Sequence, residues 1–496
     1  MSTLSHEEWK TKAAGAVLST RAFINGEFVH AVSGATYDVV NPATQKLLAK
    51  VASCDRPDVD RAVSASRTAF ESGTWSDTSP AERKTVLFRL ADLLMARRDE
   101  LGLLISLEMG KLIGDAVDIE VPLAAAVLRW HAEAADKVYG EIAPTGKGDL
   151  ALISREPIGV VGAIVPWNFP VNLAIWKLAP ALVAGNSVVL KPSERSPLSS
   201  IKLAELAAEA GVPKGVLNVI PGFGSTAGRS LALHGDVDCI AFTGSTAVGK
   251  QLLGYASESN MKQVWLECGG KSPNIVFDDC ADLAAAALTT CSGVFFNQGE
   301  VCSSNSRLLV QRRVKDQFLD AVVQNAGKIR PGDPLDPASG MGALVDDDHT
   351  RSVLSYIDDG RRSAVLVSGG SQLRVNGSGC FVEPTIFDEV PPDARIAQEE
   401  IFGPVLSVIP FETEEDAIQV ANSTIYGLAA SVWTGNLSRA LRVARKLRVG
   451  TVSINTVDAL SPLTPFGGTR QSGSGRDLSL HSLDKYSTLK TTWIKY

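Results

Sequence analysis

From residue 158 onward, short apolar runs alternate with helix-length segments of mixed polarity. Five of these runs are predicted as strands: Ile158–Val165, Ser187–Leu190, Leu217–Ile220, Cys239–Phe242 and Val264–Leu266. The segments between them are predicted as helices: Ile175–Ala184, Leu198–Glu209, Ala227–Leu233 and Val248–Ala256. Uninterrupted apolar strands separated by helices indicate a parallel sheet covered on both faces. With right-handed crossovers, the sequence predicts a doubly wound, Rossmann-like α/β domain.

The chain on either side of this region follows two other patterns. Before about residue 150 the spacing is mainly helical, with a capping box at Ser79–Glu82 and an amphipathic segment over Ala116–Lys137. After about residue 270 a second α/β series follows, with helices over Leu283–Phe296, Glu414–Asn422 and Ser438–Leu447 and strands over Leu308–Val310, Val405–Phe411, Ala429–Trp433 and Thr451–Ile454. The tail from Phe466 ends in a Thr/Lys/Trp stretch suited to an edge strand.

The composition is that of a globular chain with a large core. The 496 residues suffice for two to four domains, and 45% of them are hydrophobic against 21% charged. The net charge of −7 argues against bulk binding to nucleic acid or to an anionic membrane, although it does not exclude a local basic patch.

Cysteine and histidine usage narrows the class of protein further. The seven cysteines are odd in number and contain no C-x-x-C pair, which predicts reduced thiols in a cytoplasmic protein. The six histidines lie far apart, so no metal site is predicted. The first ten residues lack the basic and apolar regions of a secretion signal. The uncharged stretch Pro157–Trp176 is interrupted by prolines and is predicted as a buried strand plus a loop, not as a membrane span.

Each of the five predicted strands runs into a polar loop marked by glycine or proline. These loops are Pro166-Trp167-Asn168, Lys191-Pro192-Ser193-Glu194, Pro221-Gly222-Phe223-Gly224, Thr243-Gly244-Ser245 and Glu267-Cys268-Gly269-Gly270-Lys271. One such loop alone is more often a turn than a site. Because the carboxyl ends of parallel strands meet at one edge of the sheet, where ligands bind, five in succession predict a binding site there.

A dinucleotide is the ligand that these loops fit best. Gly222–Ala227 matches the pattern G-x-G-x-x-G/A, but it follows the third strand instead of the first and lacks an acidic residue about 20 positions further on. Glu194 is the better candidate to bind both hydroxyls of an adenosine ribose, with Lys191 beside it. Gly244-Ser245 opens the next predicted helix, so its amides and hydroxyl can face a phosphate.

Cys302, Glu267 and Asn168 are candidate catalytic groups, and each has a structural alternative. Cys302 lies in a polar loop where a thiol can be reached and activated, although free cysteines are more often buried packing residues. Glu267 is either a structural anion paired with a cation such as Lys271 or a general base whose pKa is raised by burial. Asn168 either donates to an oxyanion or holds its turn. A thiol, a carboxylate and an amide donor beside a nucleotide site fit acyl-thioester chemistry.

The chain resembles the aldehyde dehydrogenase superfamily over nearly its whole length. Seven motifs occur in the family order: Pro166-Trp167-Asn168-Phe169, Lys191-Pro192-Ser193-Glu194, Phe242-Thr243-Gly244-Ser245, Leu266-Glu267-Cys268-Gly269-Gly270-Lys271, Gln298-Gly299-Glu300-Val301-Cys302, Glu400-Ile401-Phe402-Gly403-Pro404 and Pro465-Phe466-Gly467-Gly468. The resemblance implies that family's α/β fold, with a Rossmann-like cofactor domain, an α/β catalytic domain and a small β flap for oligomerisation.

The resemblance also implies roles for individual residues. Cys302 corresponds to the nucleophile, Glu267 to the general base, and Asn168, with the Cys302 amide, to the oxyanion hole. Lys177 and Asp477 occupy the positions of a Lys–Glu proton relay, from which the shorter Asp477 departs. The implied cofactor is NAD, and its implied contacts are Ile164, Pro166, Trp167, Asn168, Lys191, Ser193, Glu194, Gly224, Phe242, Gly244, Ser245, Glu400 and Phe402.

The implied reaction is the oxidation of an aldehyde to a carboxylic acid. Cys302 adds to the aldehyde, hydride passes to NAD, and Glu267 activates the water that hydrolyses the resulting thioester. Glu194 favours NAD over NADP because a 2′-phosphate there would meet a like charge. Two alternatives remain: transfer of the acyl group to CoA, which the general base disfavours, and a non-enzymatic protein that keeps the fold, which the intact set of catalytic groups disfavours.

The substrate is less well defined by the sequence. Three segments resemble the bacterial branch that acts on γ-glutamylamino- or guanidino-butyraldehyde: Glu156–Val160, Ser259–Lys262 and Ser474–His481. The segment expected at the aldehyde entrance, Asn455–Pro462, departs from the aromatic and acidic pattern of that branch, which weakens recognition of a cation. The prediction is therefore a γ-glutamylamino-, guanidino- or amino-butyraldehyde, with broad aliphatic or aromatic aldehyde specificity as the alternative.

The resemblance implies a division of the chain and an assembly. Residues 1–135 and 152–266 are expected to bind NAD and residues 267–465 to form the catalytic domain. Residues 136–151 and 466–496 are expected to form a flap and tail through which the protein assembles as a homodimer or homotetramer.

Overall fold

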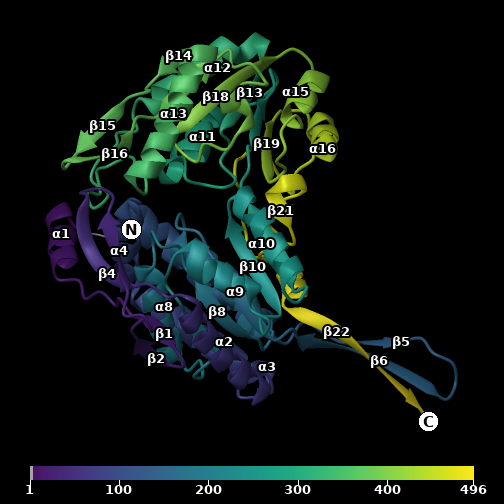
Figure 1. Cartoon of the computed structure of the whole chain (residues 1–496). Helices are drawn as coiled ribbons and strands as arrows, with labels where there is room; N and C mark the ends of the chain where they lie inside the picture. Colours follow the sequence, from purple (N-terminus) through teal and green to yellow (C-terminus); the bar gives the residue numbers. More distant parts are fainter. Residues whose placement is uncertain (1–3) are drawn as a thin grey trace.

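The computed structural model of the protein describes residues 4–496. Figure 1 shows two α/β bodies, one built from the first half of the chain and one from residues after about 270, and a narrow arm that projects away from both. Each body contains its own mainly parallel sheet. The two-body architecture agrees with the two α/β series expected from the hydrophobic pattern.

The sheet of the first body has eight strands in the order β2-β1-β9-β8-β7-β10-β11-β21. Its five inner strands are parallel and confirm the five predicted strands: β7 (Val160–Ile164), β8 (Ser187–Lys191), β9 (Leu217–Val219), β10 (Cys239–Gly244) and β11 (Gln263–Cys268). The antiparallel edge strands were not predicted: β1 (Ala22–Ile24), β2 (Glu27–Val29) and β21 (Gly473–Ser474). The C-terminal tail therefore supplies one edge of the first sheet.

Helices cover both faces of this sheet, as expected, because successive apolar residues of each strand point to opposite faces. Val188 and Leu190 pack on the side of α7 (Pro170–Val183) and α8 (Leu198–Ala210), outside which lie α3 (Pro80–Ala96), α4 (Arg98–Met109) and α6 (Val121–Ala134). Val189 packs on the opposite side, against α2 (Arg56–Glu71), α9 (Arg229–Leu233) and α10 (Thr246–Glu258).

The sheet of the second body has seven strands in the order β14-β17-β18-β13-β12-β19-β20. The four predicted strands are present as β13 (Arg307–Gln311), β18 (Val405–Phe411), β19 (Ala429–Trp433) and β20 (Thr451–Ile454). Three short strands were not predicted: β12 (Pro273–Val276), β14 (Val365–Ser368) and β17 (Thr385–Asp388). The helices of this body are α11 (Leu283–Phe295), α12 (Lys315–Ala326), α13 (Asp347–Ser363), α15 (Glu414–Ala421) and α16 (Leu437–Lys446).

The remaining elements are short. They include α1 (His6–Ala14), α5 (Ile113–Asp115), α14 (Arg395–Gln398) and two hairpins, β3–β4 (Thr36–Asn41, Lys46–Ala52) and β15–β16 (Gln372–Val375, Ser378–Val382). The helix predicted over Ala116–Lys137 begins as a π-helical turn at Ala116–Glu120 and continues as α6. Within residues 4–496, none of the helices has both the length and the apolar character that a membrane crossing requires.

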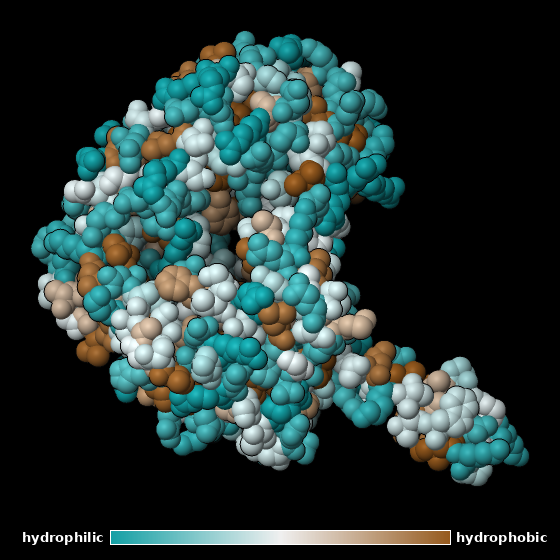
Figure 2. Space-filling view, viewed as in Figure 1, coloured by the Kyte–Doolittle hydropathy of each residue, from teal (hydrophilic) through white to brown (hydrophobic). Residues whose placement is uncertain are grey.

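The arm is a three-stranded antiparallel sheet that joins two distant parts of the chain. β22 (Ser487–Lys495) pairs along its whole length with β6 (Asp149–Pro157), which pairs in turn with β5 (Glu141–Ala143). The expected edge strand in the tail is therefore confirmed as β22. The exposed large side chains of the arm include Tyr139, Ile142, Leu489, Trp493 and Tyr496. Figure 2 shows a few brown, hydrophobic patches on the arm among white and teal ones.

Candidate active site

A cavity of about 250 Å³ lies where loops of the two bodies meet. Its wall contains Cys302, Glu267 and Asn168, the three candidate catalytic groups. It also contains Pro166, Trp167, Gly244, Ser245, Glu400 and Phe402 among the predicted cofactor contacts. The structure thus brings together side chains that lie up to 236 positions apart in the sequence, from Pro166 to Phe402.

The loop that carries Cys302 needs an unusual backbone. A tight turn precedes it, in which Asn297 and Gln298 have φ angles of 50° and 59°. Gly299 follows with φ 74°, and a Cβ there would lie 2.3 Å from the carbonyl oxygen of Gly403. Only glycine permits this approach, which brings the cysteine loop against the segment containing Glu400.

The Cys302 thiol is partly exposed and is held neutral by its surroundings. Burial raises its pKa, and the nearby carboxyl groups of Asp458, Glu400 and Glu267 raise it further. Asp458 was not singled out as a contact from the sequence. Burial raises the pKa of Asp458 also, while its hydrogen bond with Ser303 acts in the opposite direction. In the absence of ligands the site therefore contains a thiol and not a thiolate.

Asn168 is fixed by a buried ion pair that sequence spacing did not reveal. Its Nδ2 donates to the carbonyl of Glu300 at 2.8 Å, and its own carbonyl accepts from Lys111 Nζ at 2.9 Å. Lys111 also donates to Glu120, whose other carboxylate oxygen accepts from the first amides of α7 at 3.1 and 3.2 Å. Glu120 thereby caps α7, and the pair holds the loop carrying Asn168.

Glu267 lies at the end of β11 with no hydrogen bond to either carboxylate oxygen. Its side chain does not pair with Lys271, whose Nζ also makes no hydrogen bond, so the structural alternative for Glu267 is not supported. Burial and the charge of Asp477 raise its pKa to about 8, against the opposing effect of Lys177 and other cations. The carboxyl group is thus mostly protonated at pH 7 and becomes mostly ionised above about pH 8.

Lys177 and Asp477 do not line the cavity but lie behind Glu267. Lys177 Nζ donates to Asp477 Oδ2, which supports the expected pairing despite the shorter aspartate. The sequence did not point to a second partner, Lys485, whose Nζ donates to Asp477 Oδ1. Burial lowers the pKa of Lys177, and the charge of Asp477 acts in the opposite direction.

The predicted ribose contacts lie at the end of β8. Lys191 Nζ donates to Glu194 at 3.2 Å. Ser193, which lies between these two residues in the sequence, is buried. Although burial acts to raise the pKa of Glu194, Lys191 holds it below its ordinary value, so the carboxylate is ionised. Glu194 faces a second cavity of about 570 Å³, whose wall includes Tyr37 and Phe223.

The predicted contacts on the other side of the cofactor site are close-packed. Gly270 N donates to Glu400 Oε1 at 3.2 Å, and a Cβ on Gly269 would lie 1.7 Å from Glu400 Oε2. Phe402, with φ 58°, packs edge-to-face against Trp167 at 5.3 Å. The absence of a side chain at Gly269 therefore leaves room for the carboxylate that would bind a ribose.

The other predicted residues have supporting positions. Ser245 caps α10, since its hydroxyl accepts from Val248 N at 3.3 Å. Ile164 and Phe242 are buried in the strands below the loops, and Gly224 is exposed next to the second cavity. Two further residues line the cavity without a signal in the sequence: His349, which bonds to the Phe402 carbonyl at 2.7 Å, and Arg195.

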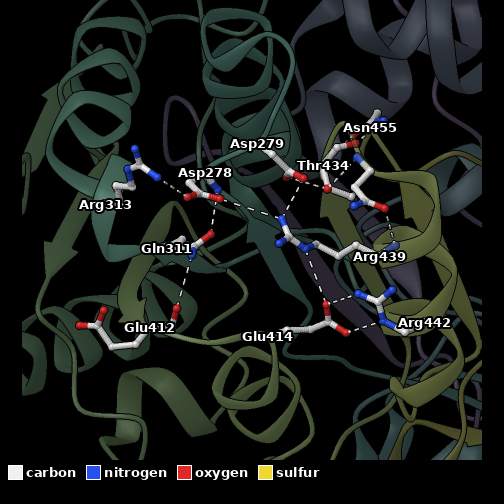
Figure 3. A network of polar contacts seen from close by, with 11 residues as sticks. Asp278, Asp279, Gln311, Arg313, Glu412, Glu414, Thr434, Arg439, Arg442 and Asn455 are labelled. Atoms are coloured by element: carbon white, nitrogen blue, oxygen red, sulfur yellow. Dashed lines mark hydrogen bonds and ion pairs between the residues drawn. The ribbon is translucent and has the colours of Figure 1, made fainter.

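The segment that carries Asp458 is anchored by a polar network in the second body (Figure 3). Asn455, with φ 54°, bonds through its side-chain amide to the backbone N–H and carbonyl of Thr434. The Thr434 hydroxyl donates to Asp279 at 2.6 Å, and Asp279 pairs with Arg439 at 2.8 Å. Arg439 lies 3.6 Å from Glu414, which joins α15 to the network. No group of metal-binding side chains was found within residues 4–496.

An open parallel sheet with polar strand ends, facing a second α/β body that contributes a cysteine, is the arrangement of a dinucleotide-dependent oxidoreductase. Residues 28–492 match the model of the aldehyde dehydrogenase family, and the chain belongs to that family. Membership confirms the resemblance found in the sequence, the expected fold class and the expected class of enzyme.

Similar proteins include several that have been named or solved. The NADP/NAD-dependent aldehyde dehydrogenase PuuC of Escherichia coli is 53% identical over 486 residues, 98% of each chain. A P. syringae indole-3-acetaldehyde dehydrogenase, solved with NAD+ and IAA, is 56% identical with a TM-score of 0.99 and full coverage of both chains. A Burkholderia cenocepacia gamma-glutamyl-gamma-aminobutyraldehyde dehydrogenase is 53% identical with a TM-score of 0.98, covering 99% of this chain and 100% of that one. The NAD+ complex agrees with the cofactor expected from the sequence.

Thiol accessibility gives a direct test of the cavity. Of the seven cysteines only Cys302 and Cys280 are partly exposed. We expect iodoacetamide to label these two under native conditions, as read by peptide mass spectrometry, and Cys302→Ala to remove one label. Because burial raises the pKa of Cys302, its labelling rate should still climb with pH where an exposed thiol has levelled off. Native labelling of Cys239 or Cys268 would contradict the packing described above.

Proposed function

We propose that the 250 Å³ cavity is the active site of an NAD-dependent, hydrolytic aldehyde dehydrogenase. The observation that carries the proposal is that Cys302, Glu267 and Asn168 line the same cavity. The free carboxylate oxygens of Glu267 support a role as base, because a structural carboxylate would be hydrogen-bonded. The residues fit NAD. The paired Lys191 and Glu194 would bind the ribose of its adenosine half, and Glu400, beside Gly269, would bind the ribose of its other half.

The chain's own groups account for the chemistry. The Cys302 thiol first loses its proton to solvent. The resulting thiolate adds to the aldehyde carbon, and the amide of Asn168 donates to the oxygen that becomes negative. The thiohemiacetal would pass its hydride to bound NAD, which would supply the acceptor and leave a thioester on Cys302. Glu267 then takes a proton from water, the new hydroxide attacks the thioester carbon, and Cys302 leaves as the thiolate. The ionised Glu194 favours NAD over NADP because it would repel a 2′-phosphate.

Two variants separate the proposed roles. Cys302→Ala should lower NADH formation from NAD and an aldehyde by about 10³-fold or more, since the covalent route is lost. Glu267→Gln should lower steady turnover by about 10²–10³-fold but keep a first burst of NADH, because only hydrolysis needs the base. Stopped-flow absorbance measures both, and the product should be the free acid with or without added CoA. Undiminished turnover in Cys302→Ala, or acyl-CoA as the main product, would overturn the proposal.

For the substrate we propose a γ-glutamylamino-, guanidino- or amino-butyraldehyde. Support comes from the similarity to the Burkholderia enzyme, which is named for γ-glutamyl-γ-aminobutyraldehyde, and to an aminoacetaldehyde dehydrogenase of Pseudomonas aeruginosa. A second candidate is an aromatic aldehyde, which a pair of partly exposed rings favours. The ring centroids of Phe169, next to Asn168, and Phe296, in the loop before Cys302, lie 6.2 Å apart. The similarity to an enzyme named for indole-3-acetaldehyde, an aromatic aldehyde, also supports this second candidate.

A substrate panel decides between the two classes. We expect kcat/KM for γ-glutamylaminobutyraldehyde to exceed that for hexanal by about tenfold or more, which corresponds to about 1.4 kcal/mol of added transition-state binding. Indole-3-acetaldehyde and benzaldehyde complete the panel, and Phe296→Leu serves as the matched variant. If the aromatic aldehydes give the highest kcat/KM, and Phe296→Leu lowers only theirs, the second candidate is the substrate class.

We further propose the domain division expected from the sequence and a homodimer or homotetramer joined through the arm. Residues 1–135 and 152–266 would bind NAD, residues 267–465 would carry the cysteine, and residues 136–151 and 466–496 would form the arm and tail. β6 continues to Pro157, so the paired part of the arm includes residues 152–157. The exposed apolar side chains of the arm support a contact between copies. The seven free cysteines support a cytoplasmic location.

The assembly is tested by light scattering during size-exclusion chromatography. Ile142 and Trp493 are 70% and 63% exposed, and changing both to Asp should convert the oligomer to a monomer. Leu437→Asp is the control, because Leu437 is 71% exposed but lies outside the arm. A monomeric parent protein, or an arm variant of unchanged mass, would contradict the proposal.

A further inference from the structure

Four ionisable side chains form a buried cluster behind the cavity. They come from four elements: Lys177 from α7, Glu267 from β11, Asp477 from the segment after β21, and Lys485 from the 3₁₀-helix Leu480–Lys485. Their exposed fractions are 1%, 5%, 0% and 2%. Because burial of a charge is costly unless it is paired, the arrangement of these four groups needs an explanation.

Asp477 is clamped from two sides by lysines. Its Oδ2 accepts from Lys177 Nζ and its Oδ1 from Lys485 Nζ. Its backbone is also fixed, since the N–H and carbonyl of Asp477 exchange hydrogen bonds of 2.7 and 2.8 Å with those of Phe466. The hydrogen bond from Lys485 thus helps to hold the Asp477 side chain in a single orientation. This side chain is one methylene shorter than that of glutamate.

The charges of the cluster balance only when Glu267 is ionised. Two ammonium groups and the Asp477 carboxylate leave one positive charge in excess, and the Glu267 carboxylate cancels it. Glu267 accepts no hydrogen bond that could stabilise its ionised form, so this form depends on nearby charge. Burial and Asp477 raise the pKa of Glu267, whereas Lys177, Lys485 and Arg476 lower it.

The other groups that face the cluster do not replace this charge. Burial lowers the pKa of His131, on α6, to about 4, and raises the pKa of Cys239, on β10, to about 12. Tyr486 has its pKa raised by burial as well, so all three are neutral near pH 7. Arg476 is the other cation, and it donates to the carbonyls of Gly468 and Gly475.

We propose that Lys485 is a positioning residue for thioester hydrolysis: its ammonium group fixes Asp477 beside Lys177 and supplies positive charge that favours the ionised form of Glu267. The inference rests on the proposed role of Glu267 as the base. Lys485 touches neither substrate nor cofactor in this scheme and acts through Asp477. The relay expected from the sequence contains Lys177 and Asp477, and Lys485 adds a third residue to it. The added ammonium group compensates for the shorter side chain of Asp477.

The sign of the effect follows from charge. Removal of the Lys485 ammonium raises the pKa of Glu267, so a larger fraction of the base is protonated at neutral pH. Hydrolysis requires the ionised base, and its rate therefore falls at low pH and recovers once the pH exceeds the new pKa. The acid limb of the pH–rate profile moves to higher pH.

The test measures hydrolysis of the acyl-enzyme in the absence of cofactor. p-Nitrophenyl acetate transfers its acetyl group to the Cys302 thiolate and releases p-nitrophenolate, and intact-protein mass spectrometry then follows loss of the acetyl group to water from pH 6 to 10. Lys485→Met should slow this loss by about tenfold at pH 7, converge with the parent near pH 9.5, and shift the acid limb by about one pH unit. Acylation of Cys302, read as the burst, should change less than twofold.

Three further variants make the outcome specific. Lys485→Gln keeps a hydrogen bond to Asp477 without the charge and should shift the limb as well, which also covers the case in which Lys485→Met does not fold. Lys485→Arg should restore most of the parent profile. Lys328→Met is the control, because Lys328 is exposed and donates to Asn325 alone.

The contradicting results differ from those that would remove the proposed function. A uniform loss of rate at every pH, or an unmoved acid limb in both neutral variants, shows that Lys485 is only structural. An acid limb that persists in Glu267→Gln shows instead that Glu267 is not the base, and it is the proposed function that then fails.

Discussion

The site depends on buried ion pairs that fix loops with no regular structure of their own. Lys111 and Glu120 are both fully buried, and between them they hold the carbonyl of Asn168 and the first amides of α7. Removing one partner of such a pair leaves an unpaired buried charge at a cost of about 3–5 kcal/mol. The orientation of Asn168 is therefore enforced by a large penalty. Glu120 belongs to a π-helical turn, a deviation that often accompanies functional positions.

The two α/β bodies contribute different properties to the cavity. The first supplies strand ends and helix starts, which favour the phosphate and ribose parts of a dinucleotide. The second supplies the cysteine loop and Glu400, and its approach is possible only because Gly269, Gly270 and Gly299 leave space for the opposing backbone or carboxylate. A side chain at any of these three positions would separate the groups that have to meet.

The sequence predicted what is local in character and missed what is formed between distant segments. The five parallel strands carry unbroken apolar runs, and the loops at their ends carry Asn168, Glu194 and Glu267, so pattern alone located them. The edge strands β1, β2 and β21 are two or three residues long and have no pattern to detect. Lys111 and Lys485 cannot be told from surface lysines in the sequence. Their pairing with Glu120 and Asp477 is seen only in the folded structure, where all four side chains are buried.

The pairing of the tail with earlier segments has a consequence for how the protein is made. β21 completes the first sheet, β22 completes the arm, and Asp477 and Lys485 complete the charge cluster, yet all are translated after the other strands of the first sheet. The amino-terminal body therefore cannot reach its final state until the tail has been made, however early its other strands assemble. Until the tail is made, β11 has no partner strand on that edge and Lys177 lacks its carboxylate, so a chain paused at that stage would present an open sheet edge.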